Sequence, residues 1–578
     1  MSDMMQNYTD DHDQHSIGYV VGGGLQENLS VRLTIPAQQV QEGAFVVMES
    51  GNLRFYGLVT DMLLGATDPR FADEQSENRL PPMLASLLHG QTLFTNLSVL
   101  STLMLDMGPE PGSAGYDEWR KAHPEDARPI PVKTIPQHHT EVKLASAGDI
   151  AEIFGEENGK ELFRIGTTRE QGHPVALDLD KFVQRSSGIF GATGTGKSFL
   201  TRVILAGLIH ADHASTLIFD MHNEYGPDDI SSDTGLAVPG LKAKFPGKVR
   251  LVGLGAGTSF RDVNPDYTLE ISEGDIRSED ILMLTGEMAL RDTTATTLAG
   301  LERDFGERRW FTEFKAMRSG AMVEDPETGK KVPAADSVAA WANQAGINVA
   351  AAEGLHSKLG RLFDKPYIVE NPAKDTLSEI ILNLDAGKHV ILSFGKYNSD
   401  LDYLLVTNLI TRRIREAWEK KTNEFRSEKK KEPRPLVVVV EEAHKLLNRE
   451  MASQTTFSTI AREMRKYYVT LLIIDQRPSQ IYDEVMSQLG TRISGWLGDE
   501  DDISAVLSGL AGRQALRGML AHLQPKEEVL MLGWGVAMPI PIRSRRYDAE
   551  FWKEVLKDKA ELKDYNEDQN NAEMGFEE

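Results

Sequence analysis

The sequence has no cysteine among its 578 residues. Disulfide bonds, thiolate zinc sites, cysteine-ligated iron–sulfur clusters and cysteine nucleophiles are therefore excluded together. Basic residues are also few, because 63 Lys and Arg stand against 87 Asp and Glu and give a net charge of −24. A protein with a negative net charge repels the phosphates of nucleic acid over most of its surface. Any binding of DNA or RNA therefore requires a local basic lining.

Long hydrophobic runs are absent as well. The longest, Leu436–Val440 and Val469–Ile474, have the length of strands and fall far short of a membrane span. Residues 1–14 are polar and acidic, without the apolar region of a secretory signal. We therefore expect a soluble, cytoplasmic protein. Hydrophobic residues still make up 40% of the chain, which is enough for the cores of several domains.

The pattern of residues 15–165 predicts an N-terminal β-barrel domain. Short apolar strands alternate there with turn signals, and Gly51-Asn52 between two apolar runs predicts a hairpin turn. Residues 1–14 before it predict a disordered lead. At the other end of the chain, residues 546–578 predict a helix followed by an acidic tail.

Residues 166–274 and 386–545 alternate apolar strand runs with helical stretches, which predicts an α/β core with a mainly parallel sheet. Residues 275–385, between the two parts, have helical periodicity broken by a polar stretch around Glu324–Val332, and predict a helical insertion. The predicted core strands are Gly188–Phe190, Thr216–Asp220, Arg250–Gly253, His389–Phe394, Leu436–Glu441, Val469–Asp475, Arg492–Leu497, Val529–Gly533 and Ile540–Arg543.

The most specific motif fits the phosphate-loop pattern G-x-x-x-x-G-K-[ST] and lies between a short apolar strand and a helix. Glycines let backbone N–H groups surround phosphates, and the helix N-terminus favours negative charge. We expect Lys197 to reach the β- and γ-phosphates of ATP and the Ser198 hydroxyl to hold Mg²⁺. A chance glycine-rich turn is the alternative, which the strand–loop–helix context disfavours. The predicted nucleotide-binding residues are Gly191, Ala192, Thr193, Gly194, Thr195, Gly196, Lys197, Ser198 and Phe199.

A second motif is the apolar strand Leu436–Val440 followed by two glutamates. Ligands of parallel sheets bind at the carboxyl ends of the strands. This position predicts that Glu441 binds Mg²⁺ and that Glu442 polarises the attacking water. The alternative is a core strand followed by an exposed helix start, where acidic residues are also favoured. The accompanying phosphate loop favours the catalytic interpretation.

Gln476 ends a further apolar strand, where it could sense the γ-phosphate and position water. A simple strand exit before Pro478 is the alternative. Arg185, Arg462 and Arg465 are candidates for stabilising charge in the transition state. Arg462 and Arg465 are three residues apart and therefore share a helix face. A solvent-exposed helix face without a catalytic role would explain this spacing equally well.

With these motifs together, the sequence resembles the HerA branch of the HerA–FtsK ATPase superfamily. The segments GATGTGKS, VVVVEEAH, IAREMRKYY and IIDQRPSQI occur in the order of that branch, and IFDMHNEYG, IGYVVGG and VLMLGWGVAMPIPIRSR are also similar to it. The resemblance implies a RecA-like ATPase core and a HAS-type N-terminal barrel. It also implies a hexameric ring that hydrolyses ATP and moves double-stranded DNA through a central channel, with an arginine supplied in trans to each nucleotide.

The resemblance further implies that Arg185 and either Arg462 or Arg465 act at the nucleotide, and that Asp220 and Glu224 lie near the nucleotide or the neighbouring subunit. It implies a partner as well, either a NurA-like nuclease in DNA-end resection or an effector in anti-phage defence, docked at the barrel end. Lys242, Lys244, Lys248 and Arg250 are candidates for a basic channel lining, with an exposed loop as the alternative.

Two other functions are compatible with the sequence. The chain could form a ring scaffold that assembles and gates a partner enzyme, with ATP hydrolysis as a switch. It could also be a secretion-type ATPase that moves protein or conjugative DNA, although no membrane segment is apparent.

Overall fold

The computed structural model describes residues 16–67, 93–109, 112–113, 115–122, 128–158, 161–230, 235, 237–256, 263–324, 329–397, 399–428, 430–451, 456–510 and 512–556. The predicted disordered lead, the acidic tail beyond residue 556 and residues 325–328 of the polar stretch lie outside these ranges.

The N-terminal part is a closed β-barrel, as the alternating pattern predicts. Its strands run in the order β2-β1-β7-β3-β4-β5, and pairing between β2 and β5 closes the barrel, while β6 extends it beside β5. In the predicted two-residue turn, Gly51 has a positive φ of +64° and Asn52 has a negative φ. A positive φ at the first central residue alone is the pattern of a type II′ hairpin turn, which favours glycine there. The strands are β1 (Ser16–Gly22), β2 (Leu29–Leu33), β3 (Phe45–Ser50), β4 (Leu53–Ala66), β5 (Leu93–Asp106), β6 (Ile130–Pro131) and β7 (Glu141–Leu144).

The second sheet has twelve strands in the order β15-β14-β20-β11-β21-β22-β10-β23-β24-β25-β8-β9. Pairing is parallel from β15 to β23 and antiparallel beyond. The predicted α/β class is thus confirmed. The strands are β8 (Leu162–Thr168), β9 (Pro174–Asp178), β10 (Ser187–Phe190), β11 (Ser215–Asp220), β14 (Val249–Leu254), β15 (Tyr267–Leu269), β20 (His389–Ser393), β21 (Leu436–Glu441), β22 (Val469–Asp475), β23 (Thr491–Ser494), β24 (Glu528–Gly533) and β25 (Ile540–Ser544).

Every predicted core strand is present, and most ends agree within a residue or two. The exception is the predicted strand Arg492–Leu497, which ends at Ser494 because the chain leaves the sheet after its last pairing with β24. Strand β8 begins at Leu162, before the expected domain boundary at residue 165. The central strands β11, β21 and β22 are buried at every position, which explains why they read as continuous apolar runs.

Helices surround this sheet and fill the connections between its strands. Helix α6 packs on β10 and β8, α13 on β11, β15 and β20, and α16 on β22. The helices are α4 (Ala147–Phe154), α5 (Leu179–Gln184), α6 (Lys197–Ala211), α7 (Leu241–Lys244), α13 (Thr376–Asp385), α14 (Asp400–Glu428), α15 (His444–Leu447), α16 (Thr456–Glu463), α17 (Asp483–Gln488), α18 (Glu500–Val506) and α19 (Arg513–Ala521). Helix α3 (Tyr116–Ala122) instead lies between strands β5 and β6 of the barrel.

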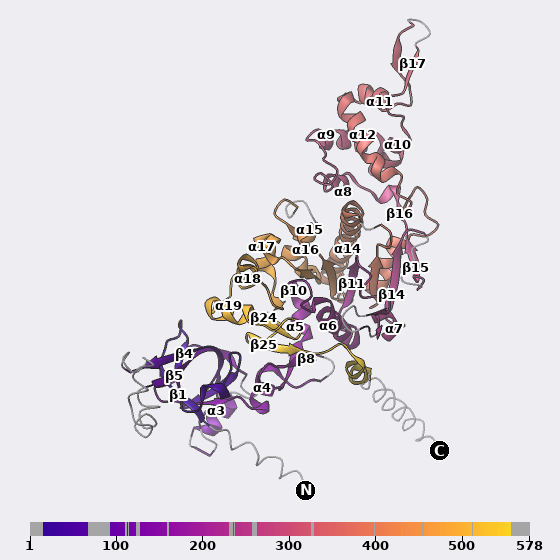
Figure 1. The fold of residues 1–578 in the computed structure, drawn as a ribbon. Helices are drawn as coiled ribbons and strands as arrows, with labels where there is room; N and C mark the ends of the chain where they lie inside the picture. The colour runs from indigo at the N-terminus through magenta and orange to yellow at the C-terminus, as the bar shows by residue number, and fades with distance from the viewer. Residues whose placement is uncertain are drawn as a thin grey trace, which may run out of the picture.

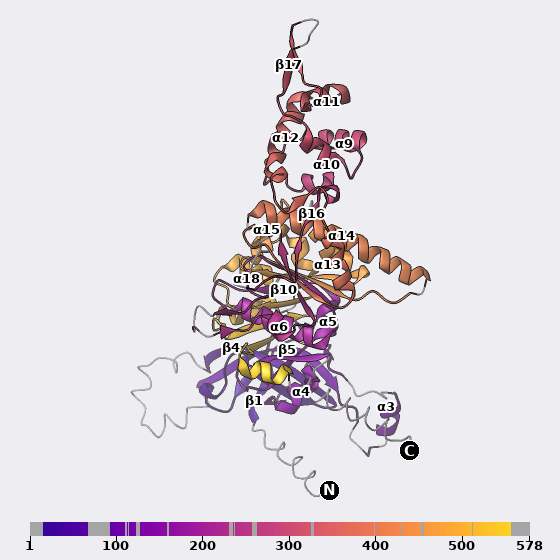
Figure 2. The same cartoon turned by 90° about the vertical axis from the view of Figure 1, so that its right-hand side faces the viewer.

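The predicted helical insertion rises from the sheet at the end opposite the barrel, as both views show (Figures 1 and 2). Its base is a parallel pair of short strands, β16 (Ile271–Ser272) and β19 (Ile368–Val369). The polar stretch forms a hairpin of β17 (Met322–Glu324) and β18 (Lys331–Pro333). Although α13 falls in the predicted insertion, it packs on the sheet. The insertion helices are α8 (Ser278–Leu282), α9 (Thr294–Phe305), α10 (Trp310–Ala316), α11 (Val338–Ala345) and α12 (Val349–Phe363).

A buried ion pair connects the insertion to the long helix α14. Arg412 donates from Nε to Asp280 Oδ1 at 3.0 Å and from Nη2 to Asp280 Oδ2 at 2.8 Å, and the Asp280 carboxylate is fully buried. Burial raises the pKa of Asp280 and the arginine opposes this rise. Loss of the arginine would leave a buried carboxylate without its partner, which is the costly way to break such a pair.

We therefore expect Arg412→Ala to lower the free energy of unfolding by about 3 kcal/mol, measured by urea unfolding followed through tryptophan fluorescence. The matched control is Arg413→Ala, because the Arg413 guanidinium lies 3.9 Å from Glu416 in a partly exposed pair. That change should cost below about 1 kcal/mol. Equal effects of the two substitutions would contradict the assignment of Arg412 as the main connection.

Candidate nucleotide-binding site

The predicted site residues lie at the carboxyl ends of neighbouring parallel strands. The phosphate loop follows β10, Asp220 ends β11, Glu441 ends β21 and Gln476 follows β22. In the sheet, β22 lies between β10 and β21. This order places Gln476 between the phosphate loop and the two glutamates, at the edge where parallel α/β sheets bind ligands.

The phosphate loop is held open for phosphate by three glycines in the positive-φ region, Gly191 (150°), Gly194 (77°) and Gly196 (89°). A Cβ on Gly191 would lie 2.5 Å from Thr195 Oγ1. Lys197 begins α6, and its Nζ donates to the carbonyl oxygens of Gly191 (2.6 Å) and Ala192 (2.9 Å). Burial lowers the pKa of Lys197, and nearby acidic groups, Glu442 foremost, oppose the change. A triphosphate supplies the anion that such a buried ammonium favours.

A chain of two hydrogen bonds connects the loop to the second glutamate. Thr193 Oγ1 donates to Gln476 Oε1 at 2.5 Å, and Gln476 Nε2 donates to Glu442 Oε1 at 3.0 Å. The amide thus contacts the phosphate loop with its oxygen and the predicted base with its nitrogen. This contact fixes the position of Glu442 relative to the phosphate loop.

Glu442 itself has a strained backbone, with φ +47°. A non-glycine residue in this left-handed region costs about 1–2 kcal/mol. Such strain persists only where the surroundings enforce it, and it is common in functional sites.

Glu441 occupies a buried and strongly acidic environment. Its Oε1 accepts a hydrogen bond from the Tyr225 hydroxyl at 2.8 Å, and its backbone oxygen accepts one from the Tyr403 hydroxyl at 3.0 Å. Burial and the neighbouring carboxylates Asp220 and Glu224 raise the pKa of Glu441 well above its usual value.

Within the described ranges, Glu441 Oε2 is buried without a hydrogen-bond partner. An unpartnered carboxylate oxygen among other acids fits a cation. No group of three His, Asp or Glu side chains in the described part of the chain is arranged to hold a metal alone. Mg²⁺ at Glu441 and Ser198 would therefore complete its shell with phosphate and water oxygens.

Asp220 and Glu224 lie on the turn that follows β11. The Asp220 carboxylate is fully buried and accepts hydrogen bonds from the backbone N–H groups of Glu224 (2.8 Å) and Tyr225 (3.0 Å). Asp220 thereby holds the turn that brings Tyr225 to Glu441. Glu224 is partly exposed, and its backbone oxygen accepts from Arg202 Nε at 2.9 Å.

None of the hydrogen bonds and ion pairs found among the described residues joins one of the three candidate arginines to the phosphate loop. Arg185 precedes β10, at the opposite end of that strand from the loop, and its guanidinium lies 4.2 Å from the Trp534 ring centre. Arg462 is exposed and pairs with Glu484 at 3.2 Å, and Arg465 is exposed in the next turn.

The basic residues proposed for a channel lining are partly paired within the chain. Lys242 Nζ donates to Asp266 Oδ2 at 2.7 Å and to the Val249 oxygen at 3.0 Å. Lys248 Nζ donates to the Ile209 oxygen at 2.7 Å. These contacts engage both lysine ammonium groups within the chain. The segment is also not the exposed loop given as the alternative, because Lys242 and Lys244 lie in α7 and Arg250 lies in β14.

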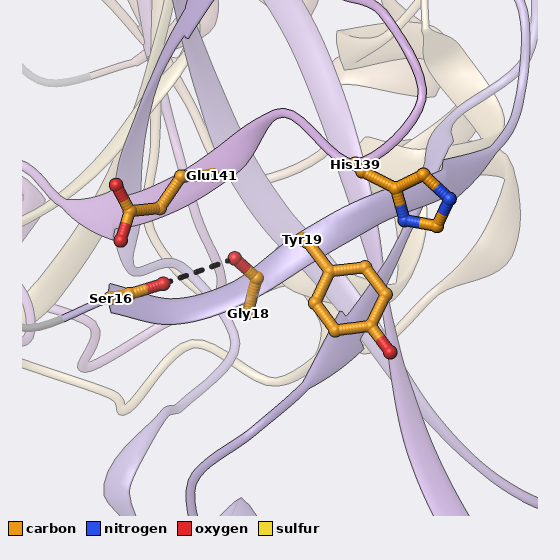
Figure 3. Close-up of a pocket in the computed structure, with 5 residues that line it drawn as sticks. All are labelled: Ser16, Gly18, Tyr19, His139 and Glu141. Carbon is orange, nitrogen blue, oxygen red and sulfur yellow. Dashed lines mark hydrogen bonds between the residues drawn. The ribbon is translucent and has the colours of Figure 1, made fainter.

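A hollow of about 300 Å³ lies on the barrel, away from the nucleotide site (Figure 3). The Tyr19 and His139 rings lie side by side there, with centres 5.6 Å apart, and Glu141 lies on the adjacent strand. Ser16 and Gly18 complete its lining. In the described part of the chain, no helix is long and apolar enough to cross a membrane.

Several residues that contact the site were not predicted, although three of them lie inside the segments IFDMHNEYG, VVVVEEAH and IIDQRPSQI. Tyr225, Tyr403 and His444 contact the predicted glutamates directly, and Asp475 binds the loops on which Glu442 and Gln476 lie. The signal of Tyr225, His444 and Asp475 in the sequence is position alone, since they follow or end core strands. Tyr403 gives no such signal, because it reaches the site from α14.

The comparisons with known proteins agree with the motifs. The family model described as "Helicase HerA, central domain" matches residues 163–414. The chain is 24% identical over 486 residues to the DNA double-strand break repair helicase HerA of Saccharolobus solfataricus, covering 82% of this chain and 81% of that one. The corresponding protein of Sulfurisphaera tokodaii is 23% identical over 542 residues, covering 92% and 94%. That of Pyrococcus furiosus is 21% identical over 432 residues, covering 71% and 73%.

Among solved structures, the chain is similar to VirB4 of Thermoanaerobacter pseudethanolicus, with a TM-score of 0.43 and 16% identity over 69% of this chain and all of that one. It is also similar to the plasmid coupling protein TrwB in complex with ADP and Mg²⁺, with a TM-score of 0.41 and 13% identity over 70% and 92%.

The contact between Tyr225 and Glu441 gives a stability prediction. Tyr225→Phe removes the hydrogen bond to a buried carboxylate, so we expect a loss of about 1–3 kcal/mol in the free energy of unfolding. The matched control is Tyr397→Phe, because the Tyr397 hydroxyl is buried without a partner among the described residues. Thermal unfolding of both variants measures the effect, and the control should keep the wild-type midpoint of unfolding or raise it. A lower midpoint in the control than in Tyr225→Phe would refute the assignment.

Proposed function

We propose that this chain is a HerA-type P-loop ATPase that uses ATP hydrolysis to translocate double-stranded DNA as a hexameric ring. The observation that carries the proposal is the pair of hydrogen bonds from Thr193 through Gln476 to Glu442, beside the buried Glu441. The similarity of most of the chain to proteins named as DNA double-strand break repair helicases also supports the proposal.

Each predicted residue has a defined task in this proposal. The loop N–H groups and Lys197 hold the phosphates, and Ser198 and Glu441 hold Mg²⁺, which offsets phosphate charge. Glu442 accepts the proton of the attacking water, and Gln476 orients that water next to the γ-phosphate. Asp220 supports the turn that carries Tyr225.

In the proposed ring, each nucleotide receives an arginine from the adjacent subunit. Arg462 or Arg465, with Arg185, would approach the nucleotide of the adjacent subunit and stabilise charge in the transition state. The three parts of the chain take separate tasks: the core (166–274 and 386–545) hydrolyses ATP, the barrel (15–165) binds a partner nuclease or defence effector, and the insertion (275–385) lies at the opposite end. A cytoplasmic location, with access to duplex DNA, is part of the same proposal.

A second function is favoured by the charge of the chain. The net charge of −24, together with the internal pairing of Lys242 and Lys248, leaves few candidates for a DNA-contacting surface. A ring that assembles and gates a partner enzyme, with hydrolysis as a switch, requires no such surface.

The first test is steady-state ATP hydrolysis with and without linear duplex DNA. We expect duplex to stimulate turnover more than single strands, and Lys197→Ala and Glu442→Gln to lower turnover by about 100-fold or more. The control for the loss of a lysine is Lys388→Ala, because Lys388 Nζ donates to the Gly247 oxygen on the surface. Full turnover by Glu442→Gln would refute its assignment as the base. A response unaffected by DNA would favour the scaffold.

The arginine in trans is tested by mixing two inactive variants. In a ring that mixes Arg465→Ala and Glu442→Gln subunits, some sites combine an intact base with an intact arginine of the neighbour. Random mixing of equal amounts should restore up to about a quarter of wild-type turnover. The same mixture with Arg462→Ala identifies which arginine acts. No recovery with either arginine variant would contradict action across the interface.

A further inference from the structure

The turn that carries Glu442 is attached to the tip of the neighbouring strand β22. The His444 backbone N–H donates to Asp475 Oδ2 at 2.7 Å, and the Ala443 N–H donates to the Ile474 oxygen at 3.4 Å. On the other side, the Tyr403 hydroxyl donates to the Glu441 oxygen. The strained φ of Glu442 is therefore enforced by contacts on both sides of it.

Asp475 connects two loops of the site with one buried carboxylate. Besides His444, its Oδ1 accepts a hydrogen bond from the Arg477 backbone N–H at 2.7 Å, and the side chain is 1% exposed. The first loop carries Glu442 and the second carries Gln476. Because both loops bind the same carboxylate, their relative position is fixed at the point where the amide meets the predicted base.

The His444 ring adds a side-chain contact to this arrangement. Its Nδ1 lies 3.0 Å from Asp475 Oδ2 and 3.6 Å from Glu442 Oε2. A carboxylate oxygen accepts hydrogen bonds, so the ring donates Nδ1–H to Asp475 Oδ2, and the same nitrogen faces Glu442 Oε2. The hydrogen bond to Asp475 raises the pKa of His444, burial opposes this, Glu442 adds to the rise and Lys445 reduces it. The Glu442 carboxylate thus lies between Gln476 on one oxygen and His444 on the other.

We propose that His444 and Asp475 are positioning residues for ATP hydrolysis, which hold the Glu442 carboxylate in line with Gln476. The proposal rests on the proposed role of Glu442 as the base. Neither residue needs to touch the nucleotide. Their removal should therefore slow the chemical step while nucleotide binding persists. The rate of hydrolysis falls because the Glu442 carboxylate is no longer correctly placed relative to the attacking water.

The test compares the kcat and KM for ATP of the full chain with the affinity for a fluorescent ATP analogue. We expect His444→Ala to lower kcat by about tenfold or more, with KM and analogue affinity within about twofold of wild type. His444→Gln, whose amide can donate to Asp475, should recover most of the lost rate. Asp475→Asn should lower kcat in the same way, and adding His444→Ala to it should cause little further loss.

The matched control is His213→Ala. It removes another histidine–aspartate pair, with Nδ1 2.9 Å from Asp180 Oδ1, at a distance from the loops of the site. Its kcat should remain within about twofold of wild type. Thermal midpoints of all variants separate loss of rate from loss of fold.

The outcomes distinguish this proposal from the function on which it rests. If Glu442→Gln is inactive and His444→Ala keeps kcat within about twofold of wild type, the positioning role is overturned and the ATPase assignment stands. A parallel loss of analogue binding in His444→Ala and His444→Gln would also overturn it. If Glu442→Gln keeps full turnover, both proposals fail together.

Discussion

The contact on which the site depends is the Gln476 amide, held between Thr193 and Glu442. It exists because β22 lies between β10 and β21 in the sheet, so that the side chain following β22 can reach the loops on either side. A single amide has one acceptor and one donor end, and here each end contacts a different part of the catalytic machinery. The phosphate loop and the predicted base are thereby placed relative to one another by the protein itself.

The acidic residues around this contact explain the physical character of the site. Burial raises the pKa of Asp220 and Glu441, and Glu441 keeps one oxygen unpartnered among the described residues. Carboxylates gathered in this way are unfavourable without a cation and favourable with one. The proposed Mg²⁺, together with the half-buried Lys197, would offset the charge of these carboxylates.

Much of the fold follows from the sequence because buried parallel strands read as uninterrupted apolar runs. The runs predict strands β21 and β22 with their observed bounds. The glycine spacing, together with the strand before it and the helix after it, predicts the phosphate loop. The order of the strands in the sheet does not follow from the sequence, because the apolar runs do not indicate that β22 lies between β10 and β21. The hydrogen bond from Thr193 to Gln476 depends on that order. The contact of Tyr403 depends on a helix far away in the chain. These features required the structure.

The central claim is that hydrolysis at this site moves the ring along duplex DNA, and displacement of a third strand from linear duplex tests it most directly. If the ring translocates, ATP should drive displacement after a lag that grows with the length of duplex between the free end and the third strand. Glu442→Gln should give none. Full ATP turnover without displacement at any length would contradict the account.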